Sequence, residues 1–121
     1  DHARWGSRQY LTAREGELVL RTRLGPAALI ETVPFEERVV INGVSVSFHP
    51  AGHILGSAQI RVEYAGQVWV VSGDYKTDPD PTCTAFEPVR CQVFITESTF
   101  GLPIYRWAPQ NETLGEMREA G

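Results

Sequence analysis

The middle of the chain alternates apolar and polar residues with the period of two that is typical of β-strands. In residues 57–64 the apolar positions share one face, and they are Ala58, Ile60, Val62 and Tyr64. This pattern predicts a strand whose other face is polar and solvent-exposed. After a turn at Ala65-Gly66, residues 68–71 form a continuous apolar run. Such a run predicts a strand buried on both faces, with Trp69 in the core.

Four further apolar runs predict strands. Residues 38–41 and 44–48 flank Asn42-Gly43, the dipeptide that most strongly indicates a tight hairpin. Residues 28–33 form another strand candidate, and residues 93–95 form a short one that we expect to be buried. The centre of the chain is therefore predicted to be a β-sheet.

Helices are predicted toward both ends. Thr12 and Glu15 have the spacing of a capping box, so Thr12 is the expected N-cap of a helix that ends at Gly25-Pro26. Residues 111–120 predict a final helix, and the two prolines and two aspartates of residues 77–81 predict a loop. These elements give an α+β fold.

Composition narrows the possible classes of protein. At 121 residues the chain forms one domain or less, and its 42% hydrophobic and 21% charged residues are ordinary for a globular protein. The formal charge of −4 argues weakly against a generally basic nucleic-acid binder. No apolar run is long enough for a membrane span. We expect Cys83 and Cys91 to be reduced thiols in a cytoplasmic protein.

Several residues with metal-binding chemistry follow predicted strands. His53 lies in a loop between Gly52 and Gly56, Asp74 follows one apolar strand, and Glu97 follows another. The hairpin between residues 57 and 71 would bring His53 and Asp74 together. Taken singly, each has an ordinary interpretation as a loop or capping residue. Imidazole and carboxylate groups together, without thiolates, favour a hydrolytic zinc site.

Other polar residues are weaker candidates. His49 lies four residues before His53, but Pro50 and Gly52 disfavour a helix that would pair the two as ligands, so we expect His49 to support the loop by hydrogen bonds. Arg61 and Lys76 could contact phosphates, although charges on a solvated face are the simpler interpretation. Residues 105–107 (Tyr-Arg-Trp) could stack on single-stranded nucleic acid or pack against other protein.

Four motifs resemble the β-CASP branch of the metallo-β-lactamase superfamily, whose members process nucleic acids. Residues 52–57 (GHILGS) resemble its third metal motif and residues 72–74 (SGD) its fourth. Residues 96–101 (TESTFG) resemble the acidic motif that opens the β-CASP insertion, and residues 1–4 (DHAR) the end of the His-x-His-x-Asp-His signature. The runs from 49 to 63 and from 69 to 107 look most like the bacterial DNA ligase-associated exonucleases.

The resemblance implies a partial metallo-β-lactamase αββα sandwich. Residues 1–96 would belong to the metallo-β-lactamase domain and residues 97–121 would begin the β-CASP insertion. By the same resemblance, two Zn2+ ions are bound. Asp1 and His2 would be ligands of the second metal and His53 of the first, Asp74 would bridge both, and Glu97 would orient a histidine near the scissile phosphate.

The implied activity is zinc-dependent phosphodiester hydrolysis, expected to be exonucleolytic on DNA. The implied partners are nucleic acid and, in DNA repair, an ATP-dependent DNA ligase and a helicase. The chain opens without Met, and the first two histidines of the signature and the later β-CASP histidines are absent, so we expect an inactive fragment of a longer enzyme. Two alternatives remain open: an RNA-processing member of the branch, and a degenerate subunit that binds nucleic acid without cleaving it.

Overall fold

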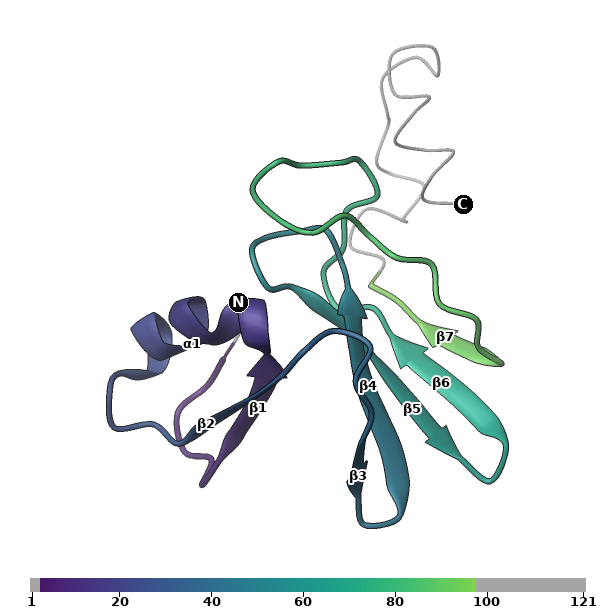
Figure 1. Ribbon diagram of the computed structural model, residues 1–121, viewed down its shortest axis with the longest axis horizontal. Coiled ribbons are helices and arrows are strands. Elements are labelled where there is room, and N and C mark those ends of the chain that lie inside the picture. The colour runs from purple at the N-terminus through teal and green to yellow at the C-terminus, as the bar shows by residue number, and fades with distance from the viewer. Residues whose placement is uncertain (1–2, 98–121) are drawn as a thin grey trace, which may run out of the picture.

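The computed structural model describes residues 3–97, which form two β-sheets and one short α-helix (Figure 1). In chain order the elements are β1 (Tyr10–Ala13), a 3-10 helix (Arg14–Gly16), α1 (Glu17–Leu24), β2 (Ile30–Val33), β3 (Val39–Ile41), β4 (Val44–Pro50), β5 (Ala58–Tyr64), β6 (Gln67–Val71) and β7 (Val93–Ile95). This mostly β arrangement is consistent with part of a metallo-β-lactamase sandwich. In this part of the chain, no helix is both long and apolar enough to span a membrane.

The larger sheet has five strands in the order β3-β4-β5-β6-β7. Its first four strands are antiparallel neighbours, and β7 pairs in parallel with β6. The β3–β4 hairpin turns at Asn42 (φ 51°) and Gly43 (φ 78°), the two positive φ angles that a type I′ turn requires. This confirms the hairpin that the sequence predicted.

The smaller sheet pairs β1 with β2 in parallel, and α1 lies beside it (Figure 1). Thr12 was predicted to cap the helix, and this is wrong: Thr12 lies in β1 opposite Thr32, and Ala13 stands at the N-cap of the 3-10 helix without a side-chain cap. Pairing with β2 keeps Thr12 extended. The predicted helix end is confirmed, since the Gly25 N–H bonds Arg21 O at 2.8 Å. The helix predicted at residues 111–120 lies outside the described residues.

The core lies where the smaller sheet covers the β4 side of the larger one. It is formed by buried Ala13, Val33 and Phe48, against which Leu11, Phe35, Val39 and Ala58 pack. The strand register places Phe48, Val71 and Trp69 on the same face of the larger sheet. Because the small sheet does not extend that far, Trp69 is 44% and Val71 37% exposed, whereas Val70 on the opposite face is fully buried.

The prediction that β6 is buried on both faces, with Trp69 in the core, is therefore wrong. In β7, Phe94 and Ile95 are each 45% exposed, so its predicted burial is also wrong. The predicted solvent-exposed polar face of β5 fails at Gln59, which is 1% exposed, whereas Ile60 on the apolar face is 39% exposed. The connection from β6 to β7 covers Gln59, whose amide bonds Glu87 O at 2.6 Å.

Candidate functional site

The larger sheet places three predicted site residues at one end. Because β5 and β6 are antiparallel, the loop before β5 and the segment after β6 leave the sheet at the same end. Strand β7 runs parallel to β6 and delivers Glu97 to that end as well. The Ser72 N–H donates to Ile95 O at 2.9 Å, which ties the two strand exits together. His53, Asp74 and Glu97 therefore lie in segments at the same end of the sheet, where these strands begin or end.

The loop that carries His53 (residues 52–57, the His53 loop) is in backbone contact with the chain that follows Asp74. The Lys76 N–H donates to Ala51 O at 2.9 Å. Gly52 has φ 71°, and a Cβ atom there would lie 2.5 Å from Lys76 O and 2.8 Å from the Phe86 N atom. A glycine at position 52 thus permits an approach that no other residue allows. The contact fixes the backbone one residue from His53 and two residues from Asp74.

The His53 loop is also held from within. Ser57 Oγ accepts hydrogen bonds from the backbone N–H groups of His53, at 3.0 Å, and Ile54, at 3.2 Å. The loop also meets the 3-10 helix, where the backbone of Gly56 lies so close to Gly16 Cα that there is no room for a Cβ atom on Gly56. The half-buried His53 therefore projects from a loop with little freedom to rearrange.

A second group with metal-binding chemistry lies near this loop. Among residues 3–97, the ligand atoms of Glu36, His49 and Glu87 all lie within 4.8 Å of one another. This is not the predicted set, since Asp1 and His2 lie outside the described residues and His53 and Asp74 are not in the group. Sequence reasoning missed Glu36 and Glu87. Nothing in the local pattern marks them, because both come from irregular chain.

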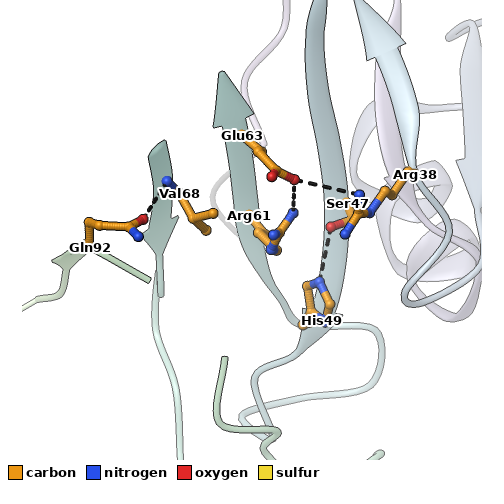
Figure 2. A network of polar contacts seen from close by, with 7 residues as sticks. All are labelled: Arg38, Ser47, His49, Arg61, Glu63, Val68 and Gln92. Carbon is orange, nitrogen blue, oxygen red and sulfur yellow. Dashed lines mark hydrogen bonds and ion pairs between the residues drawn. The ribbon is translucent and has the colours of Figure 1, made fainter. Parts of the chain in front are cut away.

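His49 itself is buried, 9% exposed, and both of its ring nitrogens have partners. Nδ1 lies 3.0 Å from Glu87 Oε1. Nε2 lies 3.0 Å from Ser47 Oγ, the contact that Figure 2 shows. A carboxylate can only accept, so Nδ1 of His49 donates to Glu87. The expected hydrogen-bonded role of His49 is confirmed, although His49 lies in β4 and not in a loop.

The two basic residues considered as phosphate contacts already have acidic neighbours. Arg61 donates to Glu63 Oε2 at 3.0 Å, an oxygen that also lies 3.5 Å from Arg38 (Figure 2). Lys76 lies 3.8 Å from Asp80 Oδ2. Hydrogen bonds from the Thr82 hydroxyl and backbone N–H, with the Lys76 charge, lower the pKa of the Asp80 carboxyl below its ordinary value. These contacts favour local ion pairs, and not phosphate binding, as the roles of Arg61 and Lys76.

Comparison with known proteins identifies relatives of this chain. No protein-family model matches the chain. It is 39% identical over 74 residues to Endoribonuclease YSH1 of Saccharomyces cerevisiae, covering 60% of this chain and 10% of that protein. It is 38% identical over 78 residues to Cleavage and polyadenylation specificity factor 73 of Drosophila melanogaster, covering 63% and 11%. The chain is a relative of β-CASP metallo-β-lactamase proteins.

This β-CASP relative spans about a tenth of the length of the curated proteins it matches. Endoribonuclease ysh1 of Emericella nidulans shows the same pattern, with 38% identity over 82 residues, 65% of this chain and 9% of that protein. The names of these relatives refer to RNA cleavage and polyadenylation. They do not support the predicted DNA ligase-associated exonuclease, nor the predicted ligase and helicase partners.

The residues of this β-CASP relative fit a hydrolytic zinc ion by their chemistry. The sheet edge offers imidazole and carboxylate groups, the donor set of catalytic zinc sites. Backbone contact between the His53 loop and Lys76 holds two of these groups on adjoining segments. Cys83 and Cys91 form no disulfide, and their eight-residue spacing matches no common structural zinc motif.

Proposed function

We propose that this chain supplies part of the metal centre of a zinc-dependent endoribonuclease. The observation that carries the proposal is its 38–39% identity to two proteins named endoribonucleases. No observation in the described residues favours DNA over RNA, because metal ligands address phosphate and not sugar. The names of these two relatives therefore decide the preference for an RNA-processing enzyme over a DNA exonuclease.

In this proposal residues 1–96 belong to a metallo-β-lactamase αββα domain and residues 97–121 begin the β-CASP insertion. His53 and Asp74 would hold the metal, with Asp1 and His2 as further ligands and Glu97 orienting an imidazole. When bound, zinc would activate a water molecule for attack and would stabilise charge on the phosphate oxygens.

The chain's own residues perform the positioning that such chemistry needs. The Ser57 hydroxyl accepts hydrogen bonds from the backbone of the His53 loop, which fixes the backbone position from which the His53 side chain extends. The close contact at Gly52 keeps this loop and the segment after Asp74 at one separation. A rigid arrangement of ligands matters because a displacement of about 1 Å in an active site can cost roughly 100-fold in rate.

The test uses the intact protein and matched RNA and DNA strands labelled at one end. We expect internal cleavage of RNA, zinc bound in elemental analysis, and loss of both in Asp74→Ala. Asp78→Ala, four residues further along, is the matched control and should keep both. Stepwise shortening of DNA alone would replace the proposal with a DNA exonuclease. Tight RNA binding by a zinc-free protein that does not cleave would favour a degenerate binding subunit.

A further inference from the structure

We infer that His49, Gln59 and Glu87 form a positioning clamp that fixes Asp74 relative to His53. The inference rests on the proposed function, because it assigns the clamp to the metal ligands. The clamp joins the β4–β5 pair to the connection between β6 and β7, and none of its three members was predicted as a site residue.

Three separate hydrogen bonds attach Glu87 to the larger sheet. Its carboxylate lies 3.0 Å from His49 Nδ1, and its backbone carbonyl accepts from Gln59 Nε2 at 2.6 Å. Its backbone N–H donates to Pro50 O at 3.1 Å. Gln59 Nε2 also donates to Pro50 O at 3.0 Å, so one amide group bonds both the end of β4 and the connection that carries Glu87. Side-chain and main-chain groups of Glu87 are thus held together.

The burial of the clamp indicates that it has a structural purpose. His49 and Gln59 face each other across β4 and β5, and they are 9% and 1% exposed. Burying polar groups costs free energy unless they are hydrogen-bonded. Among the described residues, Gln59 Oε1 is a buried atom without a hydrogen-bond partner, so Gln59 is held here at some cost. An apolar pair would pack at this position without that cost, but it could not bind Glu87.

A chain of contacts links Glu87 to the proposed ligands. The neighbouring Phe86 packs its ring against Tyr75, with ring centroids 5.4 Å apart, and Tyr75 directly follows Asp74. The Phe86 backbone also abuts Gly52, which directly precedes His53. Docking of Glu87 therefore places Phe86 against both segments that carry the ligands. Loss of the clamp would release Phe86 from both segments, and the backbone contact of Lys76 with Ala51 and Gly52 would then have to hold them without that support.

The same residues could instead hold a metal ion of their own with Glu36, but the observed contacts favour the clamp. Both nitrogens of His49 are occupied by protein groups, whereas a metal ligand needs one of them. Glu36 is exposed, and it contributes to none of the hydrogen bonds that dock Glu87. Substitution of Glu36 therefore distinguishes a metal site, which would need its carboxylate, from the clamp, which would not.

The experiment compares His49→Ala, Glu87→Ala and Glu36→Ala in the intact protein. Hydrogen exchange of residues 76–92 reports docking, chelator competition reports zinc affinity, and kcat and KM are measured on RNA. We expect His49→Ala and Glu87→Ala to speed exchange and to weaken zinc binding about 10–100-fold, as removal of outer-shell partners does. They should lower kcat with little change in KM, since the clamp acts on the ligand loops. Glu36→Ala should change none of these.

Two milder variants keep the test decisive if the alanine variants fail to fold. Glu87→Gln retains an oxygen that accepts from Nδ1, and His49→Asn retains a donor near that position, so both should recover much of the protection and zinc affinity. Unchanged exchange in residues 76–92, or zinc loss in Glu36→Ala equal to that in His49→Ala, would overturn the clamp. If wild type binds no zinc, the proposed function fails, while the exchange data still decide whether the clamp exists.

Discussion

The close contact at Gly52 makes a quantitative prediction. In Gly52→Ala the new methyl group would lie 2.5 Å from Lys76 O and 2.8 Å from the Phe86 N atom, and both are backbone atoms that cannot rotate away. A non-glycine residue at φ 71° costs about 1–2 kcal/mol. Overpacking against a fixed neighbour costs a further ~1–3 kcal/mol. We therefore expect the free energy of unfolding to fall by about 2–5 kcal/mol.

Native-state hydrogen exchange measures this loss, and the Lys76 amide is the local probe because it donates to Ala51 O. Gly66→Ala is the matched control: Gly66 has φ 79°, but nothing lies within 4 Å of its Cβ position. It should lose only the backbone contribution of about 1–2 kcal/mol. If Gly52→Ala lowers the free energy of unfolding no more than Gly66→Ala does, the His53 loop is not in close contact with Lys76 and Phe86.

Two further predictions concern the core and the surface. Val70→Ala removes two methyl groups from a fully buried position and should cost about 2 kcal/mol, whereas Val40→Ala, at a position 73% exposed, should cost less than ~0.5 kcal/mol in denaturant unfolding. Thr82→Ala removes the hydroxyl that lies 2.6 Å from Asp80 Oδ1, so the Asp80 pKa should rise toward its ordinary value in an NMR titration. Because the folded-state pKa is lowered, any stability from Asp80 is lost as pH falls through that pKa; an unchanged pKa in Thr82→Ala would contradict this cause.

Local chemistry explains which elements the sequence could predict. Asn42-Gly43 favours positive φ at both residues whatever surrounds it, and the hairpin forms there. The helix end at Gly25 is equally local. The helix start was mispredicted because Thr12 pairs with Thr32, twenty residues away, and such pairing overrides a capping pattern.

Burial was harder to predict than strand pairing, for a physical reason. Alternation in β5 correctly identifies which residues share a face, but which face is covered depends on segments far away in sequence. Gln59 is buried because the connection after β6 crosses it, and Trp69 is exposed because the small sheet ends before reaching it. An apolar run therefore predicted the strand β6 but not its surroundings.

Some residues of the candidate site could likewise be predicted from the sequence, and others could not. The sheet edge shared by His53 and Asp74 follows from one hairpin, so it could be predicted from spacing. Glu87 could not, since it lies 38 residues from His49 in a connection without periodicity. Yet buried polar groups on β4 and β5 are what allow that connection to dock in a single place, because an apolar surface would accept many positions. If the clamp is correct, the geometry of the ligands depends on residues that no ligand motif contains.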